Sequence, residues 1–368
     1  MRFKKKKIDF ILLSMVLLLV IIGIFMVYSA SKYQANINYD NPYYFLNKQI
    51  IGVLIGLVAL VGFIFIPIEK LKKFDWIFLL LSVVGLLLVF VPGVGKSNYG
   101  ATRWINLGPV TLQPSEIAKF GFIFFSASRL SSMKNDPKTF KGMLPTLISG
   151  GLICLLIIME PNMSITMCVG LCMLVMLFVG GSSIKKFILL LIPVALLVPV
   201  LIIIEPYRMQ RLTAFLDPWS APLDEGFQLI QSYYALGSGG LYGVGYGNSR
   251  QKNLFLPFAE SDFIFSIIGE EFGFIVCLFV ILIYIVIIYR GFKIAKNADT
   301  RFKSYLVAGI TSLIAIQTIL NIAVVTGSIP PTGLPLPFIS AGSTSLLVFM
   351  SAIGVVLNVD RQSKKNKI

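Results

Sequence analysis

The sequence predicts an all-α polytopic membrane protein, and two observations carry this prediction. Hydrophobic residues make up 56% of the 368 residues, and the mean hydropathy is +0.84, well above the balance of a soluble domain. Apolar runs of about 17 residues or more recur along the whole chain, and each can cross roughly 30 Å of hydrocarbon. A strand barrel would show short alternating segments instead, so we expect one helical membrane domain over residues 1–368.

The apolar runs predict about ten transmembrane helices. The first follows the basic segment MRFKKKK, and it is too long for the h-region of a signal peptide, so we expect it to be retained. The fifth and sixth meet at Glu160, Pro161 and Asn162 with almost no loop between them. The expected spans are residues 8–30, 49–68, 76–92, 113–129, 143–160, 163–181, 187–205, 262–289, 305–327 and 338–358.

The net charge of +15 follows the predicted topology. With a cytoplasmic N-terminus, most basic residues fall on the cytoplasmic side, for example in Lys4–Lys7, Lys70–Lys73 and Arg290–Lys303. This is the positive-inside bias of membrane proteins, so the charge does not call for nucleic acid as a partner. Both termini are therefore expected in the cytoplasm. The outward segments hold fewer basic residues: Lys32, Lys48, Lys96, Arg103, Arg208, Arg211, Arg250 and Lys252.

The residue inventory excludes several kinds of site. The chain has no histidine, which rules out Ser-His-Asp triads, Cys-His pairs and His-ligated metals. The short cytoplasmic connections contain no phosphate-binding G-x-x-x-x-G-K-[ST] motif, which argues against an ATP-driven pump. The four cysteines lie in apolar spans and are expected to pack as small hydrophobic groups: Cys154, Cys168, Cys172 and Cys277.

The large outward loop at residues 206–261, between the seventh and eighth spans, is the strongest functional signal. It is polar, rich in glycine and crowded with aromatic and basic residues. Two other outward segments, 92–114 and 326–345, contain prolines and glycines that a regular lipid-facing helix would not hold. Irregular backbone at membrane depth is tolerated only where protein buries it or it lines a cavity. We therefore expect the three segments to converge on one outward-facing active site.

Carboxylates near or inside the spans are the main catalytic candidates. Asp262 opens the eighth span, where the helix dipole favours its anion, and we expect it to be charged at neutral pH. The alternative is that Asp262 merely caps the helix. Glu270 and Glu271 lie about two turns deeper, where a structural role is expected for both.

Glu116 and Lys119 lie one turn apart within the fourth span. They are functional candidates because ionisable groups inside the membrane are costly, although a purely structural ion pair explains them equally well. The basic residues of the outward segments, taken together, suggest an anionic ligand. The alternative is that they only solvate the surface or touch lipid headgroups.

Ordered motifs recur along the whole chain, and together they identify a resemblance. They are Arg103-Trp104-Ile105, Gln113-Pro114-Ser115-Glu116 with Lys119, Leu216-Asp217-Pro218-Trp219, Gly226–Ser232, Gly239-Gly240-Leu241, Ser249–Lys252, Asp262–Phe265, Gly269–Gly273 and Leu336–Ser340. With these motifs the chain resembles the SEDS family of bacterial membrane glycosyltransferases (FtsW, RodA and SpoVE), most closely the FtsW/SpoVE branch. It departs from the usual family residues at Phe258, at Asn162 and at Ala341.

The resemblance implies a peptidoglycan polymerase that uses lipid II on the outer face of the bacterial cytoplasmic membrane. Asp262 matches the essential acid of the family, and Glu116 with Lys119 matches its intramembrane ion pair. A class B penicillin-binding protein is the implied partner, with other divisome or elongasome membrane proteins. No organic cofactor is implied, and a divalent cation, Mg²⁺ or Mn²⁺, stays open. The implied substrate or pyrophosphate contacts are Arg103, Arg208, Arg211, Arg250, Lys252, Gln231, Ser340 and Ser343.

The expected reaction is an inverting glycosyl transfer with Asp262 as general base. Its leaving group is a diphosphate, which requires charge stabilisation and no proton. Two other functions stay open: a lipid II flippase or transporter, and a non-catalytic scaffold for the penicillin-binding protein. The sequence does not distinguish a role in division from one in elongation or sporulation.

Overall fold

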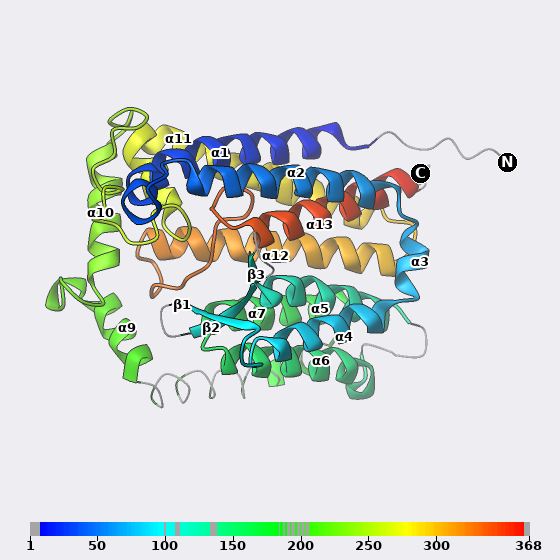
Figure 1. The fold of residues 1–368 in the computed structure, drawn as a ribbon. Coiled ribbons are helices and arrows are strands. Elements are labelled where there is room, and N and C mark those ends of the chain that lie inside the picture. The colour runs from blue at the N-terminus through cyan, green and yellow to red at the C-terminus, as the bar shows by residue number, and fades with distance from the viewer. Residues whose placement is uncertain are drawn as a thin grey trace.

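The protein is a bundle of long helices that run side by side (Figure 1). The computed structural model describes residues 8–98, 101–106, 111–132, 138–183 and 206–363, with scattered positions between 185 and 203. Within these residues, 6 helices are long and apolar enough to cross a membrane, and two shorter helices are also apolar. The protein is therefore a multi-pass membrane protein, as the composition predicts.

Each expected span that the structure describes overlaps a helix of the bundle, although several ends differ; the last helix, for example, begins at Ser343 and not at residue 338. The first helix continues past residue 30 to Tyr39, so it includes a polar segment that was expected outside the span. The expected span 187–205 lies outside the continuously described residues. The bundle helices are α1 (Phe10–Tyr39), α2 (Tyr44–Phe65), α4 (Asp75–Leu88), α5 (Pro114–Leu130), α6 (Phe140–Met159), α7 (Met163–Val179), α11 (Ile264–Lys296), α12 (Arg301–Val325) and α13 (Ser343–Gln362).

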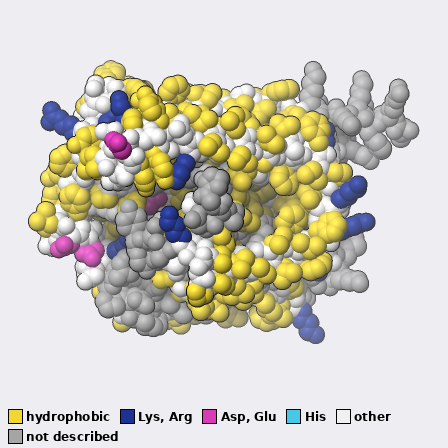
Figure 2. Space-filling model, in the orientation of Figure 1, with side chains coloured by type: hydrophobic (Ala, Val, Ile, Leu, Met, Phe, Trp, Pro, Cys, Tyr) yellow, Lys and Arg dark blue, Asp and Glu magenta, His cyan; other side chains and the backbone are white. Residues whose placement is uncertain are grey.

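The two ends of the bundle differ. At one end lie the short helix α3 (Ile68–Lys72), the start of α1 and the end of α13 (Figure 1). Across the other end run the helices of the large loop: α9 (Pro206–Leu216), the short η1 (Pro218–Ser220) and α10 (Phe227–Gly239). Hydrophobic side chains cover most of the face shown in Figure 2, and the acidic side chains visible on it lie at the left, the end that carries α9 and α10.

A small antiparallel sheet between α4 and α5 departs from the all-α prediction. Its strands are β1 (Gly95–Asn98), β2 (Ala101–Asn106) and β3 (Thr111–Leu112), in the order β1-β2-β3. Ile105 lies opposite Gly95 on one side and opposite Leu112 on the other. The prolines and glycines of this outward segment interrupt helical backbone, and strand pairing supplies its hydrogen bonds instead. The sheet carries Arg103, whose side chain reaches the carbonyl of Glu160 at the end of α6.

Helix α11 is broken at Gly273, where φ is 77° and ψ is −176°. At this break, backbone groups of the large loop form hydrogen bonds with backbone groups of α11. The amide of Val244 donates to the carbonyl of Glu270 at 2.9 Å, and that of Gly245 donates to the carbonyl of Glu271 at 2.9 Å. In return, the amide of Phe274 donates to Gly240 at 2.9 Å. The loop is therefore held to α11 by hydrogen bonds that the helix cannot make itself.

We predict that Gly273→Ala destabilises the protein. A Cβ atom at this position would lie 2.4 Å from the carbonyl oxygen of Leu241, and a positive φ of 77° is strained for alanine. The expected loss is roughly 1–3 kcal/mol, measured as a lower melting temperature in detergent. Gly237→Ala is the matched control, because a Cβ atom there meets nothing within 4 Å. Equal melting temperatures for the two variants would contradict this account of the break.

Candidate active site

Asp262 lies in the turn just before α11 and is partly buried. The N-cap of α11 is Phe263, and the helix has no side-chain capping bond, so the alternative that Asp262 caps it is wrong. The peptide carbonyl of Asp262 instead accepts a hydrogen bond from Asn321 Nδ2 at 2.8 Å. The backbone of this residue is thus fixed by α12, and its carboxylate is not used to cap α11.

Burial raises the pKa of Asp262 to about 7, and the negative charge of Glu260 adds to the shift. The positive charges of Arg211 and Arg103 act in the opposite direction, together with a hydrogen bond from Ser261. Asp262 was expected to be charged at neutral pH, whereas a pKa of about 7 leaves it partly protonated there, since desolvation outweighs the helix dipole. A carboxylate with a pKa near the working pH is suited to accept a proton in catalysis.

The irregular segment between α12 and α13, residues 326–342, passes directly beside Asp262. A Cβ atom built on Gly333 would lie 3.0 Å from Asp262 Oδ2. The neighbouring Pro331 accepts a hydrogen bond from Arg211 Nη1 at 3.2 Å, and the amide of Gly333 donates to Ser164 Oγ at 3.1 Å. This segment therefore joins Asp262 to α9 and to the first turn of α7.

Two amide side chains of α12 hold the same segment in place. Asn321 Nδ2 donates to the carbonyl of Leu334 at 2.7 Å, and Gln317 Nε2 donates to that of Pro335 at 2.8 Å. Both side chains are buried. Neither residue was predicted as part of the site, although two polar residues one turn apart inside the apolar run 305–327 were an available signal.

The buried pair Glu116–Lys119 supports Gln317. Lys119 Nζ lies 2.8 Å from Glu116 Oε1 and donates to Gln317 Oε1 at 2.7 Å. Both charged side chains are 1% exposed. Because Gln317 in turn holds Pro335, the ion pair is connected to the segment beside Asp262. This geometry gives the pair a structural role in shaping the site.

Arg103 and Glu160 meet at the corner between α6 and α7. Arg103 Nε donates to the carbonyl of Glu160 at 3.1 Å, and its Nη2 donates to the carbonyl of Pro161. Glu160 is fully buried, and neither oxygen of its carboxylate has a hydrogen-bond partner among the described residues. In the sequence Glu160 marks a boundary between two spans, and an acidic residue between two apolar runs was an available signal of a functional group.

Lys252, predicted as a phosphate contact, lies in a different environment. Its Nζ is 2.7 Å from Glu271 Oε1 and 2.9 Å from Ser29 Oγ, and the side chain is buried. Glu270 accepts hydrogen bonds from Ser249 Oγ and from the amide of Arg250. The two glutamates have the structural role expected of them, and Lys252 anchors the large loop to α1 and α11.

The remaining candidates lie in three settings. Ser340 is buried, donates to the carbonyl of Ser261 at 2.6 Å and accepts from the amide of Leu336, so it fixes the turn before Asp262. Arg250 is exposed, and Gln231 is partly buried on α10. The side chain of Arg208 lies outside the described residues.

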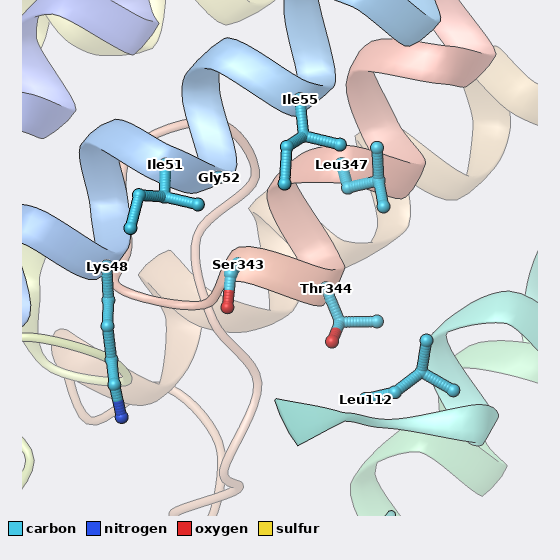
Figure 3. A pocket seen from close by; sticks show the side chains of 8 residues that line it. All are labelled: Lys48, Ile51, Gly52, Ile55, Leu112, Ser343, Thr344 and Leu347. Atoms are coloured by element: carbon cyan, nitrogen blue, oxygen red, sulfur yellow. The ribbon is translucent and has the colours of Figure 1, made fainter. Parts of the chain in front are cut away.

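Ser343 lines a groove between α2, α13 and β3 (Figure 3). Ile51, Ile55 and Leu347 form its apolar wall, and Lys48 lies at one end. Asp262 is not among the lining residues. The structure thus brings Asp262, Arg103 and Arg211 into one electrostatic environment and places Ser343 in another.

Comparison with known proteins agrees with these features. The family model described as FtsW/RodA/SpoVE cell cycle protein matches residues 9–365. Stage V sporulation protein E of Bacillus subtilis is 40% identical over 98% of this chain and 99% of its own length. The probable peptidoglycan glycosyltransferase FtsW of Saccharophagus degradans is 37% identical over 98% of this chain and 96% of its own.

Solved structures share the fold. A chain from a peptidoglycan synthase complex, described as coordinating polymerization and crosslinking, superposes with a TM-score of 0.79. It is 27% identical, and the match covers 96% of this chain and 98% of that chain. The rod shape determining protein RodA of Thermus thermophilus gives a TM-score of 0.71 at 23% identity, covering 98% of each chain.

We predict that Lys119→Met strongly destabilises the protein, because it leaves the Glu116 carboxylate buried without its counter-charge. The expected loss is roughly 3–5 kcal/mol, measured by thermal unfolding in detergent. The double variant Glu116→Gln/Lys119→Met should recover a large part of this stability. The exposed Lys70→Met serves as the control for the substitution type. Additive effects in the double variant would show that the two side chains are not coupled.

Proposed function

The chain belongs to the FtsW/RodA/SpoVE family, and from this membership we propose that it is a peptidoglycan glycosyltransferase that polymerises lipid II. The observation that supports this most is the setting of Asp262. It is a carboxylate with a pKa raised to about 7, at the end of the bundle that carries the large loop, with two arginines acting on it. A base near neutrality beside positive charge suits a hydroxyl nucleophile and an anionic leaving group.

In the proposed reaction, the 4-hydroxyl of the acceptor sugar attacks the anomeric carbon of the lipid-linked donor. Asp262 takes the hydroxyl proton as the new glycosidic bond forms. The bond between the anomeric carbon and the diphosphate breaks with inversion, and undecaprenyl pyrophosphate leaves with the bonding electron pair. Arg103 and Arg211 stabilise the charge that develops on the diphosphate.

The described residues do not bring together three His, Cys, Asp or Glu side chains that could hold a metal. Asp262 and Glu260 supply two carboxylates, and one of them is needed as the base. The proposed proton transfer uses Asp262, and Arg103 and Arg211 stabilise the charge on the diphosphate.

The orientation of the chain in the membrane is part of the same proposal. The described chain begins and ends at the bundle end opposite α9 and α10 (Figure 1). With the positive-inside bias, this supports cytoplasmic termini, about ten crossings and an active site facing outward. The match to a chain of a peptidoglycan synthase complex supports a class B penicillin-binding protein as partner, within a divisome or elongasome assembly. The sporulation and FtsW relatives favour a role in division or sporulation.

The transporter and scaffold functions receive less support. A transporter would use the intramembrane ion pair during transit, but Lys119 is fully buried and bonded to both Glu116 and Gln317. A scaffold would have no need of a carboxylate with its pKa near 7 beside two arginines.

We predict that Asp262→Asn lowers the polymerisation rate by about 10²–10⁴-fold, because the amide cannot accept the hydroxyl proton. The assay follows glycan strands made from labelled lipid II by the purified protein with its cognate penicillin-binding protein, whose transpeptidase is inhibited. Asp224→Asn is the matched control, since Asp224 is an exposed residue of the large loop. Near-normal strand synthesis by Asp262→Asn would place the base elsewhere.

We also predict that Glu260→Gln shifts the acid limb of kcat/KM to lower pH. In the wild type, the fraction of deprotonated Asp262 grows as pH rises through about 7, so kcat/KM should rise over the same range. The charge of Glu260 raises the pKa of Asp262, and its removal lowers that pKa. The measurement is the initial rate of polymerisation between pH 5.5 and 8. An acid limb that stays in place would exclude Glu260 as a contributor.

A further inference from the structure

We propose that the corner between α6 and α7 is a binding subsite for the diphosphate of the lipid-linked substrate, in which Glu160 donates a hydrogen bond to a phosphate oxygen beside Arg103. This inference rests on the proposed function and names a further substrate-binding residue for it. No covalent step is involved, because the proton stays on Glu160.

The carboxyl group of Glu160 at this corner has no hydrogen-bond partner among the described residues. Glu160 is 0% exposed, and both of its side-chain oxygens lack hydrogen-bond partners among the described residues. Buried polar groups are nearly always paired, and leaving one unpaired costs about 1–3 kcal/mol, or more for a charged group. A polar ligand that reaches this corner would supply the missing partner.

The corner between α6 and α7 is connected to the residues around Asp262. Ser164, in the first turn of α7, accepts a hydrogen bond from Gly333, the residue that borders the Asp262 carboxylate. Two more buried polar atoms lack hydrogen-bond partners among the described residues: Thr332 Oγ1, next to Gly333, and Asn321 Oδ1, whose amide nitrogen binds the backbone of Asp262. The contact between α7 and the segment before α13 therefore links the corner at Glu160 to the residues around the proposed base.

Arginines supply positive charge to this part of the protein. Arg103 from β2 is the charged group that acts on Glu160, and Arg103 also acts on Asp262. Asn162, the N-cap of α7, Ser164 on α7 and Thr332 on the segment before α13 are uncharged. Toward Asp262 the ionisable groups are Asp262 itself, Glu260 and Arg211. Two arginines near this region attract an anion.

The protonation state makes Glu160 compatible with that anion. Burial raises the pKa of Glu160 to about 8, although the charge of Arg103 opposes the shift. The side chain is therefore mostly neutral at pH 7 and carries a proton that it can donate. A phosphate oxygen accepts such a bond, whereas a charged Glu160 would repel the diphosphate.

The test measures binding of undecaprenyl pyrophosphate, so it does not depend on polymerisation. Its Kd is determined for the wild type, Glu160→Gln and Glu160→Ala between pH 6.5 and 9.5, with undecaprenol as a probe for the lipid tail alone. We expect the wild-type Kd to rise about tenfold as pH rises through 8, because the donor proton is lost and repulsion replaces it. Glu160→Gln keeps an N–H donor that does not titrate, so its Kd should lack this rise.

Glu160→Ala should bind undecaprenyl pyrophosphate about tenfold more weakly already at pH 7, with undecaprenol binding unchanged. The comparison with Glu160→Gln isolates Glu160, since Asp262 titrates alike in both proteins. An alkaline rise that persists in Glu160→Gln would overturn the proposal, even if the alanine variant fails to fold. Loss of undecaprenol binding in parallel would also overturn it, because the effect would then be structural.

The two proposals fail in different ways. If the wild type makes no glycan strands at any pH yet shows the expected binding profile, the polymerase assignment fails and the diphosphate subsite stands. If strands form but Glu160 does not affect the Kd at any pH, the polymerase stands and the subsite fails.

Discussion

The site depends on one constraint: backbone that is not helical at membrane depth needs hydrogen-bond partners from elsewhere. The segment between α12 and α13 meets this constraint through side chains of two neighbouring helices. Gln317 and Asn321 of α12 bind two of its carbonyls, and Tyr284 of α11 binds a third, that of Pro337. Asn321 also binds the backbone of Asp262, so the same contacts that satisfy the segment position the proposed base.

The buried ion pair is best understood within this network. Burying two charges is costly, and a pair of this kind often adds little net stability compared with apolar residues. Lys119 nevertheless binds Gln317, and Gln317 must present its amide nitrogen to Pro335. An ammonium group can only donate, so it fixes which end of the Gln317 amide faces it. The pair thereby determines the orientation of a side chain that an apolar core would leave unspecified.

The sequence predicted features that depend on composition and failed where tertiary partners decide. Apolar runs located the helices, and Asp262 was predicted as a catalytic candidate because it stands at the start of an expected span. The sheet around Arg103 was missed, since its strands are short and lie between Pro- and Gly-rich stretches. The sequence did not reveal the pair formed by Lys252 and Glu271. The pair belongs to a cluster that also contains Ser29, which lies far away in the chain on α1. The raised pKa of Asp262 was not predicted, because the burial that raises it has no simple signature in the sequence.

The Lys252–Glu271 pair also bears on how the chain is assembled. Glu270 and Glu271 lie in the first turns of α11, and carboxylates in an apolar helix make its insertion into the bilayer less favourable. Lys252 and Ser249, the partners of these glutamates, precede the helix in the chain and are therefore synthesised before it. Ser29 on α1 has been in place since the start of synthesis. Both acids can thus be neutralised or hydrogen-bonded as α11 emerges, before α12 and α13 exist.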